Sequence, residues 1–168
     1  IEIPLIQRDY AQGRQSESVE RIRKDFVAAL HDAVMPGGAP ISLDFIYGDV
    51  VDHTLFPLDG QQRLTTLFLL HWYLCWQAGT ALEGQAWRKF SYATRASARQ
   101  FCEALATHQP PAGETSLVPW IVDQAWYFHG WHHDSSISAM LVMLQALEKR
   151  FASANSESMK AAWKRLVD

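Results

Sequence analysis

The sequence contains little cysteine and no long apolar run, and each shortage excludes a class of protein. Two cysteines among 168 residues, Cys75 and Cys102, are too few for a disulfide-stabilised scaffold, which indicates a reduced, cytoplasmic setting. The longest apolar stretch, residues 64–76, is 13 residues long, whereas a membrane span needs about 20. The N-terminus also lacks the apolar core of a secretory signal, so we expect no membrane partner.

The chain has no strong excess of charge either. Its net charge of −3 is divided between an acidic part, residues 1–84, and a more basic part, residues 85–168. A uniformly basic nucleic-acid coat is therefore excluded, but local DNA contact is not. The acid-free stretch 85–102 mixes aromatic and basic residues, which suits contact with DNA; the alternative is a solvated helix flank beside buried aromatic rings. Its basic residues are Arg88, Lys89, Arg95 and Arg99.

Hydrophobic residues make up 48% of the chain, a typical value for a globular protein. Apolar periodicity predicts an α/β fold, with three short strands in the first 60 residues, a short extended piece at 90–92, and helices over most of the rest. Residues 61–77 are apolar all round, which predicts a central buried helix. We expect strands near 1–6, 41–47 and 55–58, and helices near 19–34, 61–77, 97–105, 117–128, 135–151 and 160–167. Because the first residue is Ile1 and the last helical stretch is unfinished, we also expect a piece of a longer protein.

A strand, a tight turn and a helix follow one another around Gly60, and this turn is the most informative part of the sequence. The first amides of a helix have no intrahelical partners, and the helix dipole adds partial positive charge there. Gly60 allows close approach of a ligand, and Arg63 adds a planar guanidinium. Together they predict an anion site suited to phosphate. The alternative is that Asp59 caps the helix and that Gln61, Gln62 and Arg63 are merely solvated.

A second polar island, Gln7-Arg8-Asp9-Tyr10, follows the first predicted strand. Arg8 would face the same anion if the first and third strands are neighbours. The alternative is an exposed loop in which Asp9 forms an ion pair.

These two motifs carry a family resemblance. The segment from Ile3 to Tyr10, with its Pro-x-x-Gln-Arg-x-Tyr pattern, and the block Asp-Gly-Gln-Gln-Arg at 59–63 resemble the N-terminal domain of GmrSD-type (type IV) restriction enzymes. The resemblance continues through 92–95 and 131–144, so it covers nearly the whole chain. It implies a ParB/sulfiredoxin-like fold: a small sheet with packed helices over 1–84, forming a nucleotide-binding core, and a helical extension over 85–168.

The resemblance also implies function. It predicts a sensor domain that binds and hydrolyses a nucleoside triphosphate with Mg²⁺ in a restriction or phage-defence protein acting on modified or foreign DNA. Such proteins carry a C-terminal HNH-type nuclease domain, but this chain has no His-Asn-His constellation, so we expect no DNA cleavage by the chain itself. A non-catalytic DNA-binding or protein-interaction module with a vestigial phosphate pocket is the alternative. A third hypothesis is a ParB-like nuclease that acts alone. It is not supported, because too few carboxylates and histidines of this chain converge near the two motifs.

The resemblance transfers roles only to matching positions. The residues predicted to act in hydrolysis are Asp59, Gln61, Gln62, Arg63 and Arg8. The residues predicted to bind the nucleotide are Gln7, Tyr10, Gly60 and Arg63, together with Thr65 and Arg95, which are not among the transferred positions. In this hypothesis Arg63 binds phosphates, Arg8 stabilises developing charge, and Gln61 or Gln62 orients water. Asp59 either caps the helix or helps to hold Mg²⁺.

Two weaker signals lie in the second half. His129, His132 and His133 have spacings that could suit zinc, but Gly130 weakens a helix there and neither cysteine is near in sequence, so a polar helix-end loop is the favoured interpretation. The tryptophans Trp120, Trp126 and Trp131 predict packing or a covered interface.

Overall fold

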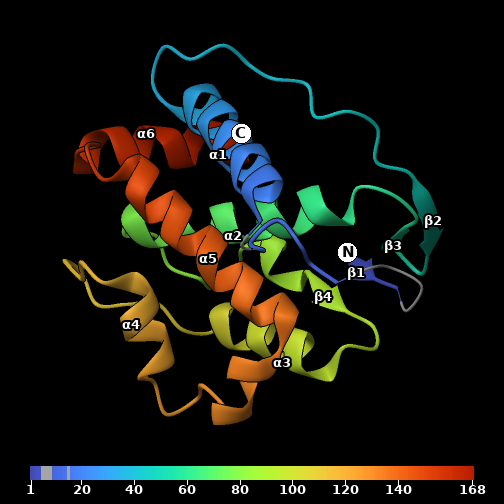
Figure 1. Ribbon diagram of the computed structural model, residues 1–168. Helices are drawn as coiled ribbons and strands as arrows, with labels where there is room; N and C mark the ends of the chain where they lie inside the picture. Colours follow the sequence, from blue (N-terminus) through green and yellow to red (C-terminus); the bar gives the residue numbers. More distant parts are fainter. Residues whose placement is uncertain (5–8, 15) are drawn as a thin grey trace.

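The fold is organised around one buried helix. The computed structural model describes residues 1–4, 9–14 and 16–168. Helix α2 (Gln61–Gln77) runs through the centre and packs against α5 (Ser135–Phe151) and α6 (Ser156–Val167), while α1 (Glu17–Val34) packs against α5 and α6 (Figure 1). Four residues of α2 have no exposed surface, as the all-round apolar pattern predicted: Leu69, Leu70, Leu74 and Cys75.

The remaining helical elements pack on α5 and on α2. Helices α3 (Ala96–Leu105) and α4 (Leu117–Val122) both contact α5. Two short 3₁₀ turns complete the set: η1 (Ala86–Lys89) packs on α2, and η2 (His129–His133) packs on α5. The predicted helix over 117–128 is therefore too long. It ends at Val122, and the chain then turns so that Tyr127 packs its ring on Phe101 and Trp131.

The strands form two separate pairs. β1 (Glu2–Ile3) pairs in parallel with β4 (Ser91–Tyr92), and β2 (Gly48–Val51) forms an antiparallel hairpin with β3 (Thr54–Pro57). β1 also contacts β3, so the first and third predicted strands are neighbours. The mixed α/β class is confirmed, while the ParB/sulfiredoxin likeness stays a prediction.

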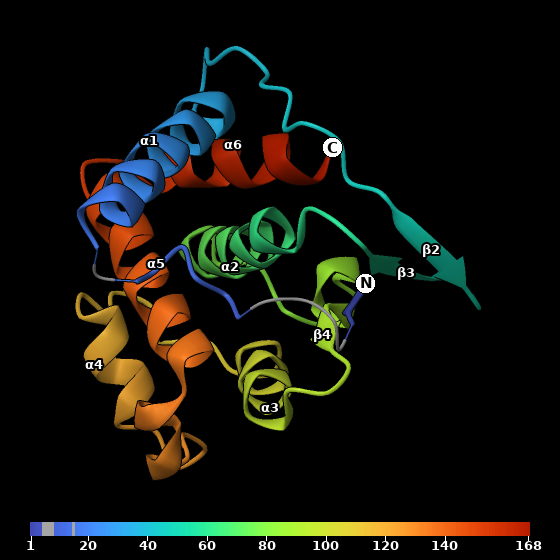
Figure 2. The same cartoon turned by 45° about the vertical axis from the view of Figure 1, so that its right-hand side comes forward.

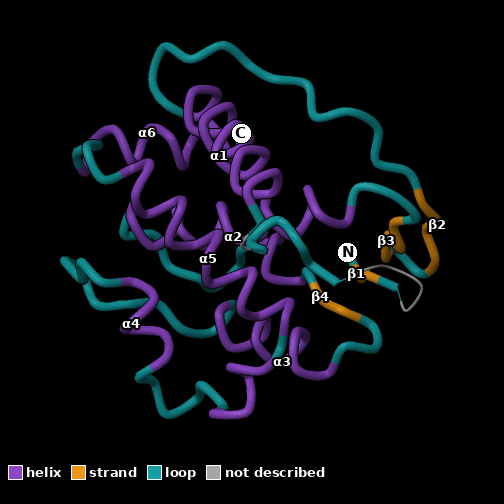
Figure 3. Tube along the Cα trace, viewed as in Figure 1, coloured by secondary structure: helices purple, strands orange, loops and turns teal. Residues whose placement is uncertain are grey.

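The prediction of a strand over 41–47 is wrong. Residues 39–47 form an extended loop, and the strand begins only at Gly48 (Figure 3). A half-buried strand needs a face to cover its apolar side, but Phe45 and Tyr47 are exposed. A two-residue turn, Asp52-His53, closes the hairpin with positive φ angles of 47° and 63°, as a tight hairpin turn requires.

The loop and hairpin together form a projection that we call the arm, residues 39–59. Figure 2 shows the β2–β3 hairpin reaching away from the helices, while the chain returns from β3 directly into α2. The arm thus joins the helical body at the predicted phosphate turn.

The predicted parts 1–84 and 85–168 share one hydrophobic core. α2 from the first part packs against α5 and α6 from the second, and β1 pairs with β4 across the predicted boundary. The division into a nucleotide-binding core and a helical extension stays a prediction. Both cysteines are free and buried, and burial raises the pKa of the Cys75 thiol to about 11.

Helix α5 begins with a side-chain cap from Asp134, the residue before its first helical residue. The Asp134 carboxylate accepts hydrogen bonds from the amides of Ser136 (2.8 Å) and Ile137 (3.0 Å), and the Ser97 hydroxyl donates to its other oxygen. This cap fixes the start of the helix that covers α2 and α1.

Replacing this cap should weaken the fold. Asp134→Ala should lower the free energy of unfolding by about 1–2 kcal/mol, because two helix amides lose their acceptor. Asp134→Asn keeps an acceptor oxygen and should cost less than half as much. Urea denaturation followed by circular dichroism measures both, and equal losses for the two variants would contradict the capping role.

Candidate functional site

The site is built on the turn between β3 and α2. Gly60 is the N-cap residue of α2 and has a φ of 88°, a conformation that residues with a Cβ rarely adopt. A Cβ on Gly60 would also lie 2.8 Å from Cγ1 of Ile46 in the arm. Glycine is therefore required here by both the backbone angle and the close contact.

No side chain among the described residues caps α2. The prediction that Asp59 caps this helix is wrong: its carboxylate turns toward Arg63, with Oδ2 3.5 Å from Nη2, and more than half of the side chain is exposed. The first-turn amides of α2 thus face no protein acceptor in the described part of the chain. Uncapped amides with the positive end of the helix dipole can accept an anionic oxygen.

Arg63 holds the arm against this turn. Its Nη2 donates to the carbonyl oxygen of Phe45 at 2.8 Å, and its Nη1 donates to that of Leu43 at 3.4 Å. The side chain is only 19% exposed, and Asp44 adds an Oδ2 at 3.8 Å from Nη1. The predicted phosphate ligand is thus also the residue that fixes the base of the arm.

Gln62 joins the two sequence motifs. Its side-chain oxygen accepts from the amide of Ala11 at 2.8 Å, and its side-chain nitrogen donates to the carbonyl oxygen of Asp9 at 2.8 Å. The Gln62 side-chain amide therefore pairs with the backbone of Asp9 and Ala11 in the way that a neighbouring strand would. Gln61, by contrast, makes no side-chain hydrogen bond to a described residue, so its amide is available to a ligand.

A buried chain of hydroxyl groups lies beneath the turn. Thr66 donates to Oε1 of Gln12 at 2.5 Å and accepts from the Tyr10 hydroxyl at 2.8 Å. Thr65 donates to its own helix and accepts from the Tyr92 hydroxyl at 2.8 Å. Burial raises the pKa of Tyr10 and of Tyr92 well above the ordinary value, so both phenols stay protonated donors.

Two residues that were predicted to bind the nucleotide, Tyr10 and Thr65, are among these buried groups. Tyr10 and Thr65 are each 1% exposed, and their hydroxyl groups are already paired. In this structure they support the turn from below. The amide of Tyr10 donates to the Ser136 hydroxyl at 3.2 Å, which ties the same segment to the start of α5.

Asp9 gathers cationic and polar groups next to the turn. Arg95 donates to its carboxylate, Ser135 donates to Oδ2 at 3.2 Å, and Nη2 of Arg14 lies 3.7 Å from Oδ2. The expectation of an Asp9 ion pair is confirmed, and Arg95 is one of its cationic partners. Gln7 and Arg8, predicted to bind and stabilise phosphate, lie outside the described residues.

The structure therefore brings much of the predicted site together. At the start of α2, Gln62 contacts Asp9 and Ala11, and Arg95 reaches Asp9. Gly60 and Arg63, in the same turn, contact the arm instead. Sequence reasoning gave Asp9 only an ion pair and gave no part in this site to Gln12 or Ser136, although all three residues hold this arrangement. Only Asp9 carried a signal, since it lies inside the first motif.

Metal binding was predicted at two places. Among the described residues, no group of three or more His, Cys, Asp or Glu side chains could hold an ion by itself. His129 and His132 stack edge to face with ring centres 5.3 Å apart in the η2 turn, which agrees with the helix-end alternative. The exposed carboxylate of Asp59 suits Mg²⁺, which proteins bind with one or two carboxylates together with substrate phosphates.

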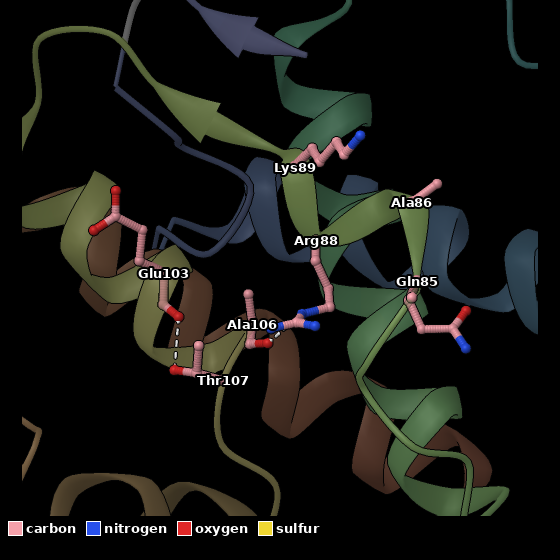
Figure 4. Close-up of a pocket in the computed structure, with 8 residues that line it drawn as sticks. Gln85, Ala86, Arg88, Lys89, Glu103, Ala106 and Thr107 are labelled. Atoms are coloured by element: carbon pink, nitrogen blue, oxygen red, sulfur yellow. Dashed lines mark hydrogen bonds between the residues drawn. The ribbon is translucent and has the colours of Figure 1, made fainter.

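The basic stretch 85–102 uses its arginines inside the fold. Arg88 donates to the carbonyl oxygens of Ala106 (2.6 Å) and Leu82 (3.1 Å), and Arg99 donates to that of Ala93 (3.3 Å). Figure 4 shows Arg88 reaching toward Ala106 in a surface hollow of about 580 Å³, with Lys89 and Glu103 at its rim. This hollow has no residue of the 59–63 block, and the engaged arginines favour the helix-flank alternative.

Fold and site together define a mixed α/β domain with a strand–glycine–helix turn to which a second polar motif is pinned. Residues 1–162 match the family described as GmrSD restriction endonuclease, N-terminal domain, and the chain belongs to this family. A restriction endonuclease acts on DNA, and this membership indicates a role in phage defence. No curated protein and no solved structure matched the chain. Within the described residues, no helix is both long and apolar enough to cross a membrane.

The double role of Arg63 predicts that the arm loosens without it. Arg63→Ala should make chymotrypsin cut after Phe45 and Tyr47 several-fold faster, because the loop loses its two guanidinium bonds and opens more often. Arg150→Ala, which removes a surface ion pair with Asp32, is the matched control and should leave the cleavage rate unchanged. Equal rates in all three proteins would show that Arg63 does not fix the arm.

Proposed function

We propose that this chain is the nucleotide-binding and nucleotide-hydrolysing sensor domain of a restriction endonuclease that acts on modified or foreign DNA. The observation that carries the proposal is the meeting of the two polar motifs at the uncapped start of α2. Family membership supports the link to DNA restriction.

Phosphate binding follows from the groups at this turn. The first amides of α2 supply N–H donors that no described side chain caps, so they can bind a phosphate oxygen. A guanidinium has five N–H donors, and the bonds from Arg63 to Leu43, Phe45 and Asp59 use three of them. The other two can bind a phosphate while the arm stays in place.

The residues around the turn divide the remaining tasks. Asp59 would take a place in the coordination of Mg²⁺, which bridges phosphates and neutralises charge when bound. Gln61 orients the attacking water, since its amide is free of other described side chains. Gln62 keeps Asp9 of the first motif beside the turn, and the roles of Gln7 and Arg8 stay those that the resemblance implies. Arg95, which pairs with Asp9, adds a further positive charge beside the turn.

A hydrolysing sensor needs a separate group to cut DNA. The resemblance assigns that task to an HNH-type nuclease domain at the C-terminal end of the full protein. The nucleotide state of this domain would then be the signal that such a nuclease reads.

The second candidate function is a non-catalytic interaction module with a vestigial pocket. The observation that favours it is the internal use of the motif: Tyr10 and Thr65 are buried, and Arg63 binds the arm.

Calorimetry distinguishes the two candidates. With Mg²⁺ present, at least one nucleoside triphosphate should bind, and Arg63→Ala should weaken that binding about 10- to 100-fold, the loss expected for charged hydrogen bonds. Gln61→Ala should slow hydrolysis while binding stays close to that of the wild type. Arg150→Ala serves as the control in both assays. If no triphosphate binds to the folded wild-type chain, the interaction module is the correct function.

A further inference from the structure

The arm exposes an unusual amount of apolar surface. Of the ten large hydrophobic residues exposed in the described part of the chain, six belong to residues 39–59. Phe45 is 87% exposed and Val50 is 70% exposed. The six are Ile41, Phe45, Tyr47, Val50, Val51 and Leu58. Single exposed apolar residues are ordinary, but a gathering of this kind marks an interaction surface.

The hairpin in the arm also offers an open strand edge. Its register pairs Val51 with Thr54 and Asp49 with Phe56 around a two-residue turn, and these pairs share the ladder hydrogen bonds. Gly48 and Val50 therefore direct their N–H and C=O groups away from β3. No described residue pairs with that edge, and an isolated two-stranded hairpin is only marginally stable in water.

The negative charge of the arm indicates which kinds of partner it can bind. Residues 39–59 contain four aspartates and no lysine or arginine. Asp44 and Asp59 lie within 4.0 Å of Arg63, but Asp49 and Asp52, on the hairpin, have no cationic partner among the described residues. This surface repels DNA. It also repels a second copy, because two-fold pairing along β2 would bring these hairpin carboxylates together.

We propose that the arm docks a partner protein through an extended basic and apolar segment that adds as a strand along β2. Main-chain hydrogen bonds from Gly48 and Val50 would supply the pairing. Lysine or arginine side chains of the segment would lie beside Asp49 and Asp52, and its apolar side chains, on the opposite face of the strand, would lie beside Val50. This interaction surface lies outside the phosphate turn and does not require nucleotide binding.

A labelled synthetic peptide of four Lys-Val repeats is the probe for this surface. Fluorescence anisotropy with the whole chain should show saturable binding that weakens as salt rises. A Glu-Val peptide of the same length should bind at least about tenfold more weakly, because its charges repel the hairpin.

Two variants of the chain test the edge and the charge separately. Val50→Pro removes an outward N–H that the hairpin ladder does not use, and Asp49→Lys reverses the charge without touching the backbone. Each should weaken Lys-Val binding by about fivefold or more, whereas Ile22→Ser, an exposed apolar residue on α1, should not. If Val50→Pro disturbs folding, the charge reversal still decides.

Four results would overturn the proposal. They are equal binding of the two peptides, Lys-Val binding that neither arm variant weakens, dimerisation of the wild-type chain that the arm variants abolish, and displacement of the peptide by short duplex DNA. Sedimentation velocity detects the dimer, and competition in the anisotropy assay detects the DNA.

Discussion

The side-chain amide of Gln62 is the contact on which the candidate site depends. Residues 9–12 cross the start of α2 without a neighbouring strand, so their backbone groups need side-chain partners. Gln62 pairs with Asp9 and Ala11, and Ser136 accepts from the amide of Tyr10. These bonds set the position of the Asp9 carboxylate, and through it the position of Arg95. The bond from Ala11 to Gln62 joins segments that are 51 residues apart in the sequence, so it is one of the contacts that hold the two polar motifs together.

Local patterns in the sequence predicted the elements well and the contacts poorly. The all-round apolar stretch of α2 and the stripe of α5 are local signals, and both helices lie where they were expected. The side-chain cap of α5, Asp134, lies one residue before the predicted start of this helix. The partners of Gln62, Arg63 and Thr66, in contrast, come from distant segments, and spacing along the chain holds no information about them. The family motif indicated which residues matter but not which of them face inward.

The arm shows why period-two alternation can mislead. The alternation over 41–47 fits a half-buried strand, but the same pattern occurs in an exposed segment whose cover lies elsewhere. Arg63 links this segment to the phosphate turn, so the acidic, apolar arm and the polar turn share one guanidinium. Gly60 also packs against Ile46, so a change in the arm should alter the phosphate turn, and a change in the turn should alter the arm. The mixed α/β class and the GmrSD family are established, and the ParB/sulfiredoxin likeness stays a prediction.

Amide hydrogen exchange at Ala11 tests the central role of Gln62 most directly. In the wild-type chain this amide donates to the Gln62 side chain, so it should exchange slowly. In Gln62→Ala it should exchange at least about tenfold faster, since one lost hydrogen bond of about 1.4 kcal/mol corresponds to that factor. Amides in the middle of α2 should keep their protection. An unchanged rate at Ala11 would contradict the account.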